Sequence, residues 1–138
     1  MNILYFNPGR SITGKKLLST IKSGGLADDV AVYRTLETFS ERLRQPAEDK
    51  TIAVVLAPTE KDLLDIYFIK YLFYKMPLVL LLPDRQGDTA AIGHRCGPRT
   101  MSYIDADFSE ITEAVHALRN RANFRREDDG YKSYQPAA

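Results

Sequence analysis

The chain has 138 residues, of which 44% are hydrophobic and 27% charged, a composition typical of one soluble globular domain. Its net charge of +1 argues against a general attraction to nucleic acid or membranes. The single cysteine, Cys96, excludes an internal disulfide and a multi-cysteine metal site, and no apolar run approaches the roughly 20 residues that span a bilayer. We therefore expect a cytoplasmic protein that uses no metal or cofactor and has no secretion signal.

The chain opens on a strand, a loop and a helix. Residues 1–6 are mostly apolar and predict a strand, and the proline and glycines of residues 7–14 predict a loop. Apolar residues spaced three and four apart then predict a helix over residues 15–23. Gly24 and Gly25 end this helix, because glycine readily adopts the left-handed backbone of a helix end.

The next part of the chain repeats the pattern. Residues 30–33 predict a second strand, and a short amphipathic helix follows, which begins at Glu37 or Thr38 and ends near Arg44. The third strand, residues 51–56, is almost purely apolar, as expected for a central strand that is covered on both faces.

The longest helix signal lies over residues 60–75. Thr59 caps its start, Asp62 stands in the position of a capping box, and Pro77 follows its end. The fourth strand, residues 78–82, is again apolar throughout, which predicts that both of its faces are buried.

Three further segments complete the pattern. The sequence predicts a helix over residues 89–95, a fifth strand over residues 100–104, and a helix over residues 109–121 that is capped by Ser109. Five strand–helix units predict an α/β fold with a five-stranded, doubly wound parallel sheet and helices on both faces. The flavodoxin-like strand order 2-1-3-4-5 is the natural arrangement for five strands.

The order and lengths of these elements are shared with one known family. The chain begins with an apolar strand, and its last predicted strand carries Tyr103, with Phe108 shortly after it. In these features the chain resembles the receiver domain of bacterial response regulators, the CheY-like fold. We expect a receiver-like domain over residues 1–122 and a polar, loosely ordered tail over residues 123–138.

The resemblance also implies where a phosphorylation site would lie. Receivers hold magnesium on two acidic residues after the first strand and carry a phosphoacceptor aspartate after the third, with a serine or threonine and a lysine nearby. The corresponding positions here are occupied by Asn7, Pro8, Ala57, Leu82 or Pro83, and Ala106. Magnesium needs carboxylate oxygens, and an acyl phosphate needs an aspartate nucleophile. We therefore expect no catalytic residues, no enzyme activity and no aspartyl phosphorylation by the usual route.

This reasoning predicts a pseudo-receiver that works in signal transduction, as in a two-component system, through protein–protein interaction, and we expect it to act as a homodimer. The helix over residues 60–75 is one candidate surface. At 100° per residue, one of its faces would cover the sheet and contains Leu63, Leu64, Tyr67, Tyr71 and Tyr74. Another side contains Phe68, Ile69, Leu72 and Phe73. Either neighbouring helices bury this second set, or it forms an interface with a partner or a second copy. Tyr103 marks a second candidate interface.

An alternative function is small-anion or nucleotide binding by the loop from Asn7 to Lys15. Gly9, Gly14 and Lys15 have the spacing G-x-x-x-x-G-K after a strand, in which backbone amides can hold phosphate. Arg10 would add a positive charge. The next residue is a lysine, where a nucleotide-binding loop carries a serine or threonine that binds magnesium.

Nucleic acid is not an expected partner. Arginines and aromatic residues near residues 119–134 can bind single strands, but the acidic run over residues 127–129 offsets their charge. A third hypothesis is a purely structural homodimer that works inside a larger complex.

Overall fold

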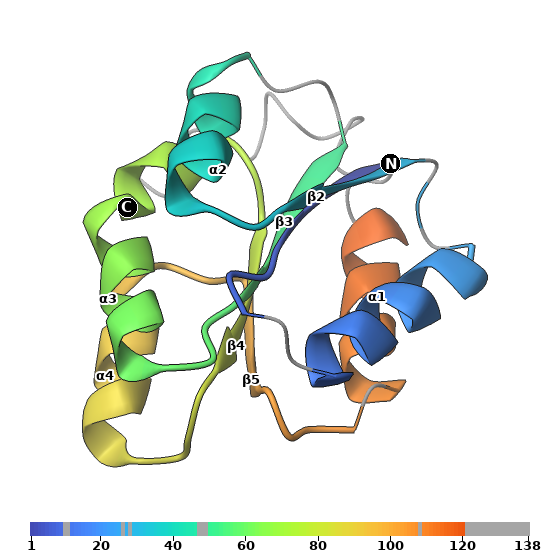
Figure 1. Ribbon diagram of the computed structural model, residues 1–138. Coiled ribbons are helices and arrows are strands. Elements are labelled where there is room, and N and C mark those ends of the chain that lie inside the picture. The colour runs from blue at the N-terminus through green and yellow to red at the C-terminus, as the bar shows by residue number, and fades with distance from the viewer. Residues whose placement is uncertain (10–11, 26, 28, 47–49, 108, 121–138) are drawn as a thin grey trace, which may run out of the picture.

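The computed structural model describes residues 1–9, 12–25, 27, 29–46, 50–107 and 109–120. Its centre is a five-stranded, all-parallel sheet with the order β2-β1-β3-β4-β5, which confirms the predicted fold class (Figure 1). The strands are β1 (Asn2–Phe6), β2 (Asp29–Tyr33), β3 (Thr51–Leu56), β4 (Leu78–Leu82) and β5 (Thr100–Tyr103).

Helices cover both faces of this sheet (Figure 1). One face packs against α2 (Leu36–Arg44), α3 (Glu60–Phe68), the 3₁₀ helix η1 (Lys70–Phe73) and α4 (Gly87–Arg95). The other face packs against α1 (Ile12–Ser23) and the helix over residues 109–120, which is orange in Figure 1. Every residue of β3 and β4 is buried, in keeping with their apolar sequences.

Several elements begin earlier than the sequence predicted. Helix α1 begins at Ile12 and α4 at Gly87, and α2 begins at Leu36 because Thr35 is its cap. The Thr35 hydroxyl accepts a hydrogen bond from the backbone N–H of Thr38 at 3.2 Å. These starts were missed because first-turn residues carry little of the apolar spacing on which the prediction relied.

Of the two helix caps that the sequence predicted at Thr59 and Ser109, only Thr59 acts as the capping residue. Thr59 caps α3 as predicted and accepts a hydrogen bond from the N–H of Asp62 at 3.1 Å, while its hydroxyl donates to the Asp62 carboxylate at 2.9 Å. Ser109 is not the acceptor at the start of the last helix. Its N–H donates to the Asp107 carboxylate at 3.0 Å, so the aspartate supplies the cap.

The largest correction concerns the helix predicted over residues 60–75. The α-helix ends at Phe68, and the backbone continues as 3₁₀ helix over Lys70–Phe73. Its bonds shorten to three residues, as in the bond from the N–H of Leu72 to the carbonyl of Ile69 at 2.9 Å. This change of winding determines which aromatic residues reach the surface.

Within the described ranges, no helix has both the length and the apolar character that a membrane-spanning segment needs. The tail predicted over residues 123–138, and also Arg10 and Phe108, lie outside the described residues.

Candidate functional site

The carboxyl end of β1 is closed by the side chain of Asn7, which is buried. The Asn7 N–H donates to the carbonyl of Tyr33 at 3.0 Å, which continues the pairing of β1 with β2. Its side chain lies against Gly14 in the first turns of α1, where an added Cβ would overlap Nδ2 and lie 2.9 Å from Cγ. The Oδ1 atom has no hydrogen-bond partner among the described residues.

A second buried contact joins the same strand and helix. The Tyr5 hydroxyl donates to the Gly14 carbonyl at 2.6 Å. Burial raises the pKa of Tyr5 well above its ordinary value, so this hydroxyl remains a donor at neutral pH. Two side chains therefore contact Gly14 from the sheet, that of Tyr5 in β1 and that of Asn7 directly after it.

The remaining positions that correspond to the receiver site carry apolar side chains that are buried or half-buried. Ala57, after β3, is completely buried, and its N–H donates to the Leu81 carbonyl at 2.9 Å. Leu82 is also completely buried and faces α4, where it closely contacts Gly93. Pro8 is half-buried and Ala106 is half-buried in the turn after β5. The register places Asn7, Pro8, Ala57 and Leu82 at the carboxyl ends of three neighbouring strands, and Ala57 and Leu82 both belong to the core beside α3 and α4.

Carboxylates do occur after β4 and β5, but they already have partners. Asp84 accepts a hydrogen bond from the N–H of Gln86 at 2.9 Å. Asp105 accepts two hydrogen bonds from Arg85, at 2.8 and 2.7 Å, and these bonds lower the pKa of Asp105. The Arg85 guanidinium also lies 4.3 Å from the centre of the Tyr103 ring. In the described part of the chain, no group of three or more His, Cys, Asp or Glu side chains is arranged to hold a metal.

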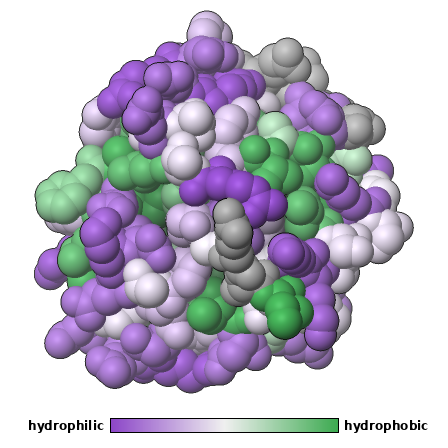
Figure 2. Space-filling view, in the orientation of Figure 1, coloured by the Kyte–Doolittle hydropathy of each residue, from purple (hydrophilic) through white to green (hydrophobic). Residues whose placement is uncertain are grey.

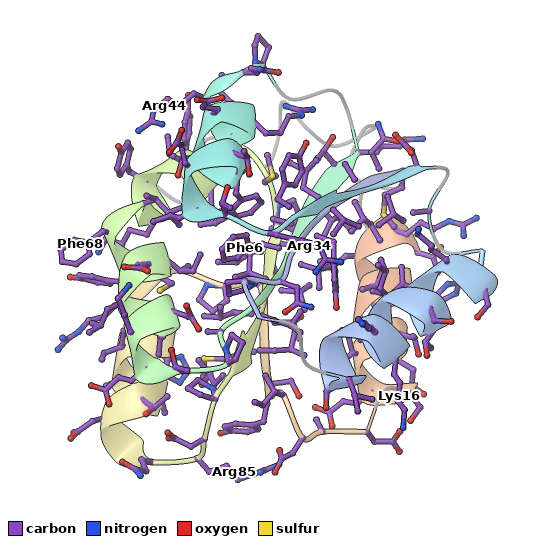
Figure 3. All side chains as sticks on the ribbon, viewed as in Figure 1. Phe6, Lys16, Arg34, Arg44, Phe68 and Arg85 are labelled. Carbon is purple, nitrogen blue, oxygen red and sulfur yellow. The ribbon has the colours of Figure 1, made fainter. Side chains whose placement is uncertain are left out.

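The described residues proposed for anion binding differ in their surroundings. Helix α1 begins at Ile12, so Gly14 and Lys15 lie in its first turns. Gly14 faces Asn7 and Tyr5, while Lys15 lines a shallow hollow on the outer side of α1 with Leu18. Lys16 is exposed as well (Figure 3). Gly9 is half-buried, and Arg10 lies outside the described residues.

Three of the four large apolar side chains that are exposed in the described ranges occur where α3 passes into η1 and just after it. Phe68, Tyr71 and Tyr74 are 72%, 60% and 78% exposed, and we call these three residues the aromatic patch. Figure 3 shows Phe68 pointing away from the sheet. Hydrophilic residues cover most of the face shown in Figure 2, where apolar residues gather in separate areas.

The patch differs from the surface that the sequence predicted. Ile69, Leu72 and Phe73 were grouped with Phe68 as a candidate interface, but all three are buried in the core beside α2 and α4. Conversely, Tyr71 and Tyr74 were predicted to cover the sheet, but they are exposed. The prediction assumed 100° per residue, whereas 3₁₀ winding turns 120° per residue and aligns residues three apart.

Basic side chains border the aromatic patch. The Lys70 ammonium lies 4.4 Å from the centre of the Tyr67 ring, and that of Lys75 lies 5.3 Å from the centre of the Tyr74 ring. Neither lysine forms a salt bridge with a carboxylate in the described ranges. Arg44, at the end of α2, projects on the same side of the view as Phe68 (Figure 3).

Cys96 is poorly placed to act as a nucleophile. It is buried, and its thiol donates to the Ile92 carbonyl at 3.4 Å. Burial raises the pKa of Cys96 to about 11, and Lys70 offsets only part of this effect. Since the thiolate is the reactive form, this thiol is inert near neutral pH.

Sequence reasoning missed the arrangement of Arg85, Tyr103 and Asp105. A signal was available, because Arg85 and Asp105 lie within three residues of the ends of β4 and β5, which are neighbours in the predicted strand order. No comparable indication of the aromatic patch exists in the sequence, because the exposure of its side chains depends on the 3₁₀ winding of Lys70–Phe73.

The sequence matches no protein-family model, and no curated protein is significantly similar to it. The strand order and the helices on both faces place the chain in the class of flavodoxin-like α/β proteins. Receiver domains share this architecture, but the architecture also supports many unrelated functions.

Proposed function

We propose that the protein is a receiver-like signalling module that takes no phosphoryl group and acts by contact with another protein. The observation that carries the proposal is the nature of the side chains at the carboxyl ends of β1 and β3. A buried methyl group, that of Ala57, lies where a phosphoacceptor would be needed, and the neutral Asn7 side chain lies against Gly14. A phosphoryl group and its magnesium ion carry charges that neither side chain can balance.

The aromatic patch supports the second half of the proposal. Large exposed aromatic side chains that lie together are typical of protein interaction sites. Each such side chain contributes roughly 1.5–3 kcal/mol when it is buried, so three together can drive a specific contact. The patch lies on α3, on η1 and directly after η1, so a contact made by it does not need the carboxyl ends of β1 and β3.

The phosphotransfer half is tested by incubating the protein with acetyl phosphate and Mg²⁺ and measuring its intact mass. An authentic receiver domain, treated in parallel, shows that the reagent is active. We expect the mass of this protein to stay unchanged. An added phosphoryl group on any aspartate would overturn the proposal.

The contact half is tested with a double variant, Phe68→Ser with Tyr74→Ser. Ile12→Ser is the matched control, because Ile12 is 70% exposed but lies on α1, on the opposite face of the sheet. Proteins that co-purify with the wild type and with the control should be lost with the double variant. Equal recovery with all three proteins would mean that the patch is not the contact surface.

A further inference from the structure

The aromatic patch has a regular shape. From Phe68 to Tyr74 its members follow each other at intervals of three residues, and most of this stretch is 3₁₀ helix. Because 3₁₀ winding rises about 2 Å per residue, the backbone positions of successive members are about 6 Å apart along the axis. The patch is therefore a short row of rings, which fits a peptide segment whose apolar side chains recur at that interval.

Two lysines near the row have no carboxylate partner in the described ranges. Lys75 lies over the ring of Tyr74, which belongs to the row, and Lys70 lies over the ring of Tyr67, the residue before Phe68. Asp65, three residues before Phe68, is paired with Lys61 at 3.3 Å, so its negative charge is offset. A ligand on the row therefore meets two positive charges, and these favour a negatively charged partner.

A second copy of the chain fits this surface poorly. In a two-fold symmetric contact the same patch faces itself, so the lysines of both copies would approach one another. Like charges that face each other in an interface cost several kcal/mol. The area is also small: three rings of about 200 Å² each, exposed by roughly two thirds, give about 400 Å² per copy. The total of about 800 Å² is below the range of stable interfaces, about 1,200–2,000 Å².

From these observations we infer that the aromatic patch binds an acidic segment of a partner protein that carries regularly spaced apolar side chains. The inference rests on the proposed function and adds the chemistry of the partner. Apolar side chains of the segment cover the row of rings, while its carboxylates pair with Lys70 and Lys75. The ring of Tyr67 holds the Lys70 ammonium in place beforehand, and the ring of Tyr74 holds that of Lys75, which reduces the side-chain entropy lost on binding.

The test uses two labelled synthetic peptides of equal length, with identical leucine positions and either glutamate or lysine at the remaining positions. Binding to the full chain is measured by fluorescence anisotropy at low and high salt. We expect the glutamate peptide to bind at least about tenfold more tightly, a difference of about 1.4 kcal/mol. This preference should shrink at high salt, because exposed charges are screened.

Two sets of variants make the test specific. Lys70→Glu with Lys75→Glu should reverse the preference between the peptides, and Phe68→Ser with Tyr74→Ser should abolish binding of both. Ile12→Ser should bind like the wild type. All substituted residues are exposed, and circular dichroism confirms that each variant is folded.

The outcomes separate this inference from the proposed function. Equal affinity for the two peptides, no binding of the glutamate peptide, or no response to the charge reversal would overturn the inference. Loss of co-purifying proteins from the double serine variant would still support the proposed function in that case. A dimer seen by light scattering that disappears in that variant would overturn the inference in favour of a second copy.

Discussion

Gly14 is a point of close contact between the end of β1 and helix α1. Glycine within a helix ordinarily costs about 1 kcal/mol relative to alanine. Here the side chain of Asn7 occupies the space that a Cβ would need, and the Tyr5 hydroxyl binds the Gly14 carbonyl. The glycine therefore allows the end of β1 and helix α1 to pack closely.

Gly14→Ala should lower the free energy of unfolding by about 1–3 kcal/mol, because overpacking outweighs the better helix propensity of alanine. Gly87→Ala is the matched control. Gly87 also lies in the first turn of a helix, but nothing lies within 4 Å of the position of its Cβ. Urea unfolding should show the control to be unchanged or slightly more stable. Equal stabilities of the two variants would contradict the packing role.

Arg85 shows how single residues depend on the tertiary structure. It forms a two-bond ion pair with Asp105, which is 20 positions away, and it stacks on Tyr103. These residues meet because β4 and β5 are neighbours. The pair is exposed, so it contributes little to stability and mainly holds two loops in place.

At the scale of elements, the segment after Phe68 departs most from the prediction. It contains three aromatic residues and the β-branched Ile69, all of modest helix propensity, and Pro77 prevents a longer helix. Winding as 3₁₀ helix turns Ile69 and Leu72 to the same inner side. Burial of each is worth roughly 1.5–3 kcal/mol, which exceeds the cost of poorer hydrogen-bond geometry.

Leu72→Glu should therefore lower the stability of the fold strongly, whereas Phe68→Glu should leave it almost unchanged. Leu72 is buried, and a carboxylate there loses its hydration without gaining a partner, so we expect a loss of more than about 4 kcal/mol. Phe68 is exposed, and its replacement should change stability by no more than about 0.5 kcal/mol. Thermal unfolding followed by circular dichroism distinguishes them. Similar melting temperatures would show that residues 69–73 are not in the core.

At the scale of the whole molecule, both cores contain a buried acid that is neutral at physiological pH. Cys96 belongs to the core beside α3 and α4, and Tyr5 to the core beside α1. Burial raises the pKa of both groups in the folded protein. Unfolding exposes them and returns each to its ordinary pKa.

This difference predicts that stability falls in alkali. Above pH 9 the unfolded chain loses the Cys96 proton while the folded protein retains it up to about pH 11, so rising pH favours the unfolded state. We expect this effect to remove about 1–3 kcal/mol across that window. Tyr5 adds a further decline above pH 10.

Urea unfolding at several pH values measures the slope. Cys96→Ala should flatten the decline between pH 9 and 11, and Tyr5→Phe should flatten the part above pH 10. A slope that is unaffected by Cys96→Ala would show that the thiol is not protected from solvent.

The sequence alone determined the sheet and its strand order, because apolar runs bounded by proline and glycine admit few other arrangements. It also determined which residue types follow the strands, including Asn7, Pro8 and Ala57. Only the tertiary structure decided which aromatic side chains are exposed, because the winding after Phe68 depends on what the core can bury. It likewise decided that Gly14 faces Asn7 and that Arg85 meets Asp105, since both contacts join segments that only the fold brings together.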